Sequence, residues 1–105
     1  MRIFHLATEA AWNSAQAAGT YTVSTLGLDL AEVGFIHCSQ AEQLAGVHER
    51  FYREVAGPLR LLTIDTDLLT SPWRLDPVEG EPLPFPHIYG PLNVDAVVSA
   101  EAYRP

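Results

Sequence analysis

The sequence contains no lysine and only one cysteine among its 105 residues. Without lysine, the chain cannot form a Schiff base and lacks the lysine with which Walker-type loops bind phosphate. With Cys38 alone, an internal disulfide and a cysteine-based zinc site are both excluded. No apolar run reaches the roughly 20 residues of a membrane-spanning helix, and residues 1–6 are too short for the apolar part of a signal peptide. We therefore expect a cytoplasmic protein.

Positive charge is also scarce. Thirteen acidic residues face six arginines, which gives a formal net charge of −7. Such a chain repels the phosphates of duplex nucleic acid and the surface of an anionic membrane, so we expect neither as a partner. A small anionic ligand remains compatible with the sequence if one or two arginines converge locally. The length suits a single domain over residues 1–105, and 48% hydrophobic residues are enough to form a core.

Local patterns predict two helices in the N-terminal half. Thr8 is a suitable N-cap for a helix over residues 9–18, and Gly19 supplies a left-handed stop. Ser39 and Glu42 have the spacing of a capping box, and the residues that follow them are apolar at helical spacing.

Short strands are predicted along the whole chain. They cover residues 2–6, 34–38, 59–64, 73–78 and 96–100. The segment 82–91 holds four of the eight prolines. Because proline removes hydrogen-bond donors from a sheet, we predict an edge or a rigid extended loop here rather than a central strand. Strands and helices do not alternate regularly, which favours an α+β domain over a doubly wound sheet.

Three histidines have similar surroundings. Each of His5, His37 and His87 lies in or beside an extended segment with apolar neighbours, and each has a hydroxyl-bearing residue within three positions. A buried imidazole needs hydrogen-bond partners, so a core histidine satisfied by the backbone is the simplest interpretation of any one of them. The three together favour a shared polar pocket. Since neighbouring side chains of a strand point to opposite faces, Cys38 is predicted to pack in the core rather than to act with His37.

Three segments taken together resemble the DUF952 family, and their order and spacing match over nearly the whole chain. They are Ile3-Phe4-His5-Leu6-Ala7 with Trp12, Gly34-Phe35-Ile36-His37-Cys38-Ser39 with Gln43, and Phe85-Pro86-His87-Ile88-Tyr89-Gly90-Pro91-Leu92. This family is of unknown function. DUF952 proteins look like small members of the ADP-ribosyltransferase-like superfamily. The resemblance therefore implies a small α+β domain of ADP-ribosylation-like fold, with a split, bent sheet and two main helices around a nicotinamide dinucleotide cleft.

The same resemblance implies NAD or a related nucleotide-like molecule as the ligand, and ADP-ribosyl transfer as the reaction. His5 matches the strand-borne histidine that holds the NAD ribose in that superfamily. His37 and Ser39 lie in a segment similar to the Val-His-Leu-Ser-like strand of RNA 2'-phosphotransferases. The glutamate that transferases carry on a late strand has no direct counterpart. Asp76 and Glu79 are the nearest candidates, and this departure weakens a catalytic role more than a binding role.

In a transfer reaction, a carboxylate near the ribose C1 stabilises the positive charge that builds as the nicotinamide bond breaks. The candidate catalytic residues are His5, His37, Asp76 and Glu79. The candidate ligand-binding residues are His5, His37, Ser39, Arg74, His87 and Tyr89. Two alternatives stay open. One is a non-catalytic small-molecule binding module on the same fold. The other is a metal-dependent enzyme that uses His5, His37 and His87, although no closely spaced pair of ligands supports it.

Overall fold

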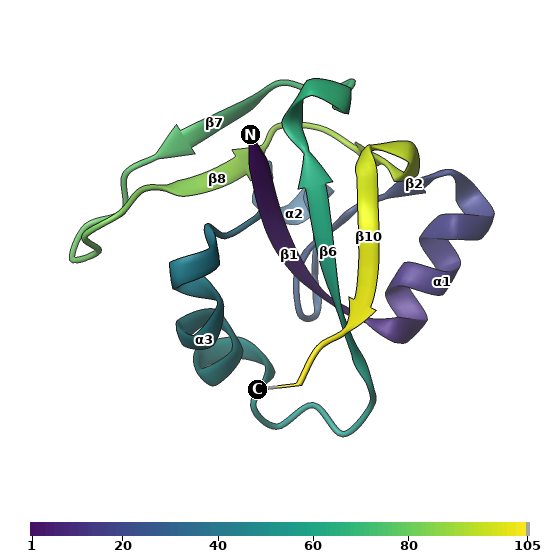
Figure 1. Ribbon diagram of the computed structural model, residues 1–105, viewed down its shortest axis with the longest axis horizontal. Coiled ribbons are helices and arrows are strands. Elements are labelled where there is room, and N and C mark those ends of the chain that lie inside the picture. Colours follow the sequence, from purple (N-terminus) through teal and green to yellow (C-terminus); the bar gives the residue numbers. More distant parts are fainter. Residues whose placement is uncertain (105) are drawn as a thin grey trace.

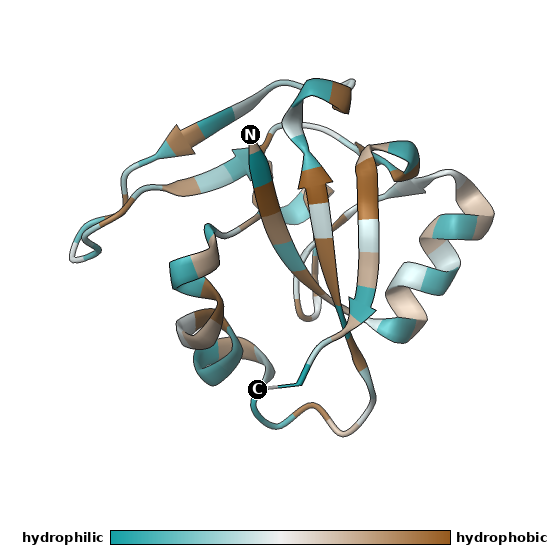
Figure 2. Ribbon diagram, in the orientation of Figure 1, coloured by the Kyte–Doolittle hydropathy of each residue, from teal (hydrophilic) through white to brown (hydrophobic). Residues whose placement is uncertain are grey.

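The computed structural model describes residues 1–104 and arranges their strands in several small antiparallel sheets. The longest sheet contains, in order, β1 (Arg2–Thr8), β6 (Leu59–Asp65) and β10 (Val97–Ala102). β6 pairs with both neighbours, so β1 and β10 are the outer strands of this sheet. Figure 2 shows hydrophobic residues concentrated along these three strands.

The first sheet is buried on both faces. Ile3 and Leu62 enter one hydrophobic cluster, whereas Leu6 and Leu59 enter another. Neighbouring side chains of a strand point to opposite sides, so the two clusters lie on opposite faces of the sheet. The first cluster also takes residues from the N-terminal helix, and the second takes residues from the helical segment 41–52. These helical segments therefore cover opposite faces of the sheet.

The N-terminal helix, α1 (Glu9–Ala18), has the predicted limits. The side chain of Thr8 caps its first turn, and Gly19 ends it with a φ of 88°, in the left-handed region that favours glycine. Trp12 and Ala15 are its buried residues. The local sequence was sufficient to predict this helix because both of its ends are fixed by neighbouring residues.

The second predicted helix is a succession of short helical turns. They are η1 (Ala41–Gln43), α3 (Leu44–Val47) and η2 (His48–Tyr52), a π-helical turn. The predicted capping box of Ser39 and Glu42 is wrong, since Gln40 and Gln43 form the box one residue later. The backbone of Ser39 is instead paired with that of Phe4, each N–H donating to the other carbonyl, at 2.7 and 2.9 Å. This pairing holds Ser39 outside the helix.

The second sheet of three strands contains, in order, β5 (Ile36–His37), β8 (Phe85–Ile88) and β7 (Trp73–Asp76). The prediction that residues 82–91 would form no central strand is therefore wrong. Pro86 is accommodated because its nitrogen faces β5 at the point where β5 ends, so the missing donor costs one hydrogen bond at most. Its carbonyl still accepts a hydrogen bond from the Cys38 N–H at 2.9 Å.

The backbone bridge between Phe4 and Ser39 joins the two sheets, so the β-structure is split but continuous at this point. Figure 1 shows β7 and β8 beside the N-terminal end of β1, with α3 below them. The remaining elements are β2 (Thr20–Tyr21), β3 (Val23–Thr25), β4 (Leu28–Asp29), α2 (Leu30–Val33), η3 (Thr66–Leu68), β9 (Leu92–Asn93) and η4 (Val94–Ala96). None of the helices in the described part of the chain has the length and apolar composition needed to cross a bilayer.

Candidate functional site

One face of the second sheet gathers most of the candidate residues. The side chains on this face are those of Phe35, His37, Arg74, Asp76, Phe85, His87 and Tyr89. They share it because they occupy alternate positions along β5, β7 and β8, with Phe35 directly before β5 and Tyr89 directly after β8. Ile36, Cys38 and Ile88 point to the other face and belong to the first hydrophobic cluster. Cys38 is thus a core residue, as predicted, and burial raises the pKa of its thiol.

Asp76, His87 and His37 form a hydrogen-bonded relay on this face. Asp76 Oδ2 lies 2.8 Å from His87 Nδ1 and also accepts a hydrogen bond from the Tyr89 hydroxyl. His87 Nε2 lies 3.3 Å from His37 Nδ1. A carboxylate only accepts, so Nδ1 of His87 carries a proton. With both imidazoles neutral, His37 donates from Nδ1 and keeps a lone pair on Nε2 at the far end of the relay.

The charges of the relay follow from its contacts. The Tyr89 hydroxyl holds the pKa of Asp76 below its usual range, with further help from His87 and Arg74, so this carboxyl group is ionised at neutral pH. Burial lowers the pKa of His37 to about 4, and electrostatic interactions with His87, His5 and Arg50 also disfavour a positive charge on His37. His37 is therefore uncharged at neutral pH and offers Nε2 as an acceptor.

Aromatic rings pack against the middle of the relay. Phe35 stacks on His87 with ring centroids 3.9 Å apart, and it also stacks on Tyr89. The Arg74 guanidinium lies over the Tyr89 ring at 4.3 Å, and its Nε is 3.5 Å from Asp76 Oδ1. Arg74 is mostly exposed, so it covers the relay from the solvent side.

His37 lines a cavity of about 420 Å³ between the helical segment 41–52 and the connection from β7 to β8. The charged and aromatic residues that line it are His37, Glu42, Arg50, Phe51, Glu81 and Phe85. The side-chain amide of Gln43 donates to the carbonyls of Leu83 and Pro84 at 3.2 and 3.1 Å, which ties the connection to the helical segment across one end of the cavity.

His5 supports His37 from behind. Its Nδ1 lies 2.7 Å from the His37 carbonyl oxygen, and its Nε2 lies 2.9 Å from the Tyr21 hydroxyl. A carbonyl only accepts, so Nδ1 is the donor, and Nε2 accepts the hydroxyl proton of Tyr21. Burial lowers the pKa of His5 to about 4. Because both ring nitrogens are occupied and the side chain does not line the cavity, the geometry gives His5 a positioning role.

The other predicted site residues lie elsewhere. Ser39 is buried at the junction of the two sheets and does not line the cavity. Glu79 is exposed in the connection between β7 and β8, so of the two carboxylates considered, Asp76 is the one brought to the histidines. Within residues 1–104, three or more His, Cys, Asp or Glu side chains do not come together as a metal-ligating group, and the arrangement does not favour the metal-dependent alternative.

Sequence reasoning missed Arg50, Phe51 and Tyr21 as site residues. Arg50 and Phe51 sit on the helical segment and line the cavity with His37, and Tyr21 donates its hydroxyl proton to His5 Nε2. In both segments an aromatic residue lies two positions from a histidine, Phe35 with His37 and Tyr89 with His87. This spacing places each pair on one face of a strand and was a usable signal for the shared face. Nothing in the local sequence indicated that the helix would lie against it.

Comparisons with known proteins show the family and give no activity. The family described as "Protein of unknown function (DUF952)" matches residues 6–100. The crystal structure of protein CC0527 from Caulobacter crescentus is 31% identical, with a TM-score of 0.82 over 97% of this chain and 85% of that chain. The solution NMR structure of CC0527 is 29% identical, with a TM-score of 0.73 over 94% and 81%. Both were structural-genomics targets. A comparison with curated proteins found no match.

Proposed function

This chain belongs to the DUF952 family, and we propose that it binds a nucleotide-like small molecule in the cavity beside His37. One observation carries the proposal: a single cavity combines an arginine without an ion-pair partner in residues 1–104, a neutral imidazole and two phenylalanine rings. Its volume of about 420 Å³ lies in the range of roughly 300–1,000 Å³ that holds drug-sized ligands.

Arg50 is the group suited to an anion. Its guanidinium is near enough to His37 to help lower the pKa of that imidazole, so the two side chains lie close together in the cavity. Guanidinium groups bind phosphate oxygens through paired, charge-assisted hydrogen bonds. Arg50 is therefore the expected phosphate contact.

The remaining lining groups suit the rest of a nucleotide. Phe51 and Phe85 offer apolar surface for a base, and His37 Nε2 can accept from a ribose hydroxyl. Glu42 and Glu81 can accept from hydroxyl or amino groups but repel additional negative charge. This mixture favours a ligand with one anionic group and several donors over a simple dianion.

NAD is the specific ligand to test first. The support for it is the resemblance to ADP-ribosyltransferase-like proteins, together with the split sheet joined at Phe4 and Ser39. A cavity of this size suits one nucleotide half, with the other half outside.

ADP-ribosyl transfer is the second candidate, and the relay favours it. As the bond from ribose C1 to nicotinamide breaks, its electron pair leaves with nicotinamide, and an acceptor oxygen or nitrogen bonds to C1. The acceptor proton passes to His37 Nε2, and His87 and ionised Asp76 stabilise the imidazolium through the relay. Asp76 does not line the cavity, so a carboxylate near C1 would be Glu42 or Glu81.

Titration of the ¹⁵N-labelled protein with AMP, adenosine and NAD tests binding. We expect amide shifts at His37, Arg50, Phe51 and residues 78–85. Arg50→Gln should weaken AMP binding by about ten- to hundredfold, because a charge-assisted hydrogen bond contributes roughly 1.5–3 kcal/mol, and should leave adenosine binding unchanged. Arg53→Gln is the matched control, since Arg53 is one turn away, outside this cavity, and paired with Glu49 at 2.7 Å.

The absence of amide shifts with all three ligands, or shifts scattered over the acidic surface, would overturn the binding proposal.

If NAD binds, the release of nicotinamide from NAD measures transfer. His37→Gln should abolish the release and keep NAD binding within a fewfold. Equal release from wild type and His37→Gln would remove His37 from the reaction.

A further inference from the structure

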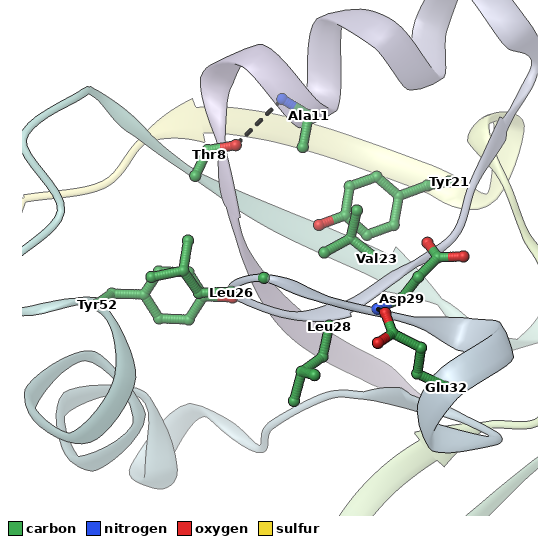
Figure 3. A pocket seen from close by; sticks show the side chains of 10 residues that line it. Thr8, Ala11, Tyr21, Val23, Leu26, Leu28, Asp29, Glu32 and Tyr52 are labelled. Carbon is green, nitrogen blue, oxygen red and sulfur yellow. Dashed lines mark hydrogen bonds between the residues drawn. The ribbon is translucent and has the colours of Figure 1, made fainter.

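We propose that a second cavity, separate from the one beside His37, binds a small molecule that has an apolar body and a protonated amine. This cavity measures about 250 Å³ and lies between the start of α1, the β3–β4 hairpin and Tyr52 (Figure 3). The two cavities have no lining residue in common.

The walls of this cavity are apolar and partly open. Ala11, Val23, Leu26 and Leu28 line it. Leu26 and Leu28 are 43% and 44% exposed, and covering such large aliphatic side chains is favourable. An apolar body of a ligand would remove both leucines from water, and this provides the main affinity.

Two buried tyrosines provide the polar interior. Figure 3 shows Tyr21 and Tyr52 entering from opposite sides, with their hydroxyl ends toward the middle of the cavity. The hydroxyl proton of Tyr21 is used by His5 Nε2, whose other ring nitrogen donates to the His37 carbonyl. The Tyr21 oxygen can therefore only accept from a ligand, and the ligand must bring the donor.

The charge of the lining selects a cation. Asp29 and Glu32 lie at one end of the cavity, and none of the described residues that line it is basic. Both carboxylates also cap α2, with the Asp29 N–H donating to Glu32 Oε1 at 3.0 Å, and each keeps a further oxygen lone pair. In a chain of net charge −7, an ammonium group is attracted here and a carboxylate is repelled.

Three matched probes test the proposal: 2-phenylethylammonium, neutral 2-phenylethanol and anionic 3-phenylpropionate. Their binding is followed by amide shifts of the full chain. We expect the amine to bind most tightly and the carboxylate least, with shifts at residues 21–32, and we expect added salt to weaken only the amine. The combined Asp29→Asn and Glu32→Gln variant keeps both caps, because Asn and Gln serve in the same positions. It should weaken the amine about five- to tenfold and leave the alcohol unchanged.

The control for overall charge is the combined Asp67→Asn and Glu101→Gln variant. It removes the same two charges at exposed positions outside the cavity and should bind the amine as wild type does. Equal binding of all three probes, equal loss in the control variant, amine shifts at His37 and Arg50, or no shifts at all would each overturn the proposal. Nucleotide binding maps to the other cavity, so either proposal can fail without the other.

Discussion

The hydrogen-bond partners of His5 fix its protonation more firmly than the sequence could indicate. Its neighbours in the chain predict a buried, satisfied imidazole, but the actual partners come from Tyr21 and His37, 16 and 32 residues away. Asp76 and Glu79 were likewise equal candidates in the sequence. Only the pairing of β7 with β8 brings one of them to His87. Residue types were therefore predictable, whereas their contacts depend on sheet register.

The stability of the protein should fall as the pH is lowered from 6.5 toward 4. Burial lowers the pKa of His5 to about 4 in the folded state, so the unfolded state binds more protons in this window. The contribution of His5, at most roughly 3 kcal/mol, is complete above the unfolded pKa and is lost as the pH falls. His37 adds a change of the same sign. Urea unfolding between pH 6.5 and 5 measures it.

His5→Gln should flatten this pH dependence by about half, since one of two such histidines is removed. His48→Gln serves as the control because His48 lies on η2, away from the relay. An unchanged slope in His5→Gln would contradict the assigned cause.

Replacing Asp76 by Asn should uncouple the relay without unfolding the sheet. Two hydrogen bonds to a carboxylate become hydrogen bonds to a neutral amide, which should lower the free energy of unfolding without abolishing the fold. The imidazole ¹⁵N signals of His87 should change from a single tautomer to a mixture. Glu79→Gln removes a neighbouring exposed carboxylate and should alter neither quantity. Similar ¹⁵N spectra for the two variants would show that Asp76 does not set the tautomer.

At the scale of elements, sequence patterns succeed where both ends are local. Thr8 and Gly19 determine α1 through contacts within one turn. Sequence patterns fail where a distant strand competes for the same backbone groups. The backbone of Phe4 pairs with that of Ser39, and the second helical segment therefore starts one residue later than predicted. The central position of β8 is equally non-local, because the cost of Pro86 depends on where β5 ends.

Two glycines should respond in opposite ways to alanine. Gly90 has a φ of 153°, and an added Cβ would lie 2.5 Å from Ser71 Oγ, which itself donates to the Pro91 carbonyl at 2.7 Å. Gly90→Ala should therefore destabilise the protein by about 1–3 kcal/mol. Gly46 lies within α3 with no atom within 4 Å of an added Cβ, so Gly46→Ala should stabilise it by about 0.5–1 kcal/mol. Thermal unfolding of both variants compares them directly, and a shift of the same sign in both would contradict the structure.

At the scale of the whole molecule, one sheet supports two hydrophobic clusters. β1 and β6 contribute to both, so neither cluster can lose its packing while the other keeps an intact sheet. The sequence predicted both strands but not that each face of the sheet would be buried. It did not indicate which helical segment would cover each face, because that depends on the connections.

Leu62→Ala should destabilise the entire molecule by about 3–5 kcal/mol in a single transition. Leu62 is fully buried at the centre of β6, and a large cavity would remain after truncation. Tryptophan fluorescence reports the first cluster, because Trp12 belongs to it and Trp73 packs against it, and the Phe85 amide signal reports the second; the two urea curves should coincide. Leu68→Ala, at a side chain 49% exposed, should change stability by no more than about 0.5 kcal/mol. Separate transitions for the two probes would show that the clusters unfold independently.

The single thiol of the chain sits at the junction of the two sheets. Cys38 is fully buried between His37 and Ser39, and its N–H is bonded to Pro86. A thiol reagent can react there only in molecules that have opened transiently. The rate of labelling under native conditions therefore measures how often the junction of the two sheets opens, with no need for an introduced cysteine. A ligand bound against His37 would lower that frequency. The labelling rate of Cys38 in the unmodified protein would therefore fall as the cavity beside His37 fills with ligand.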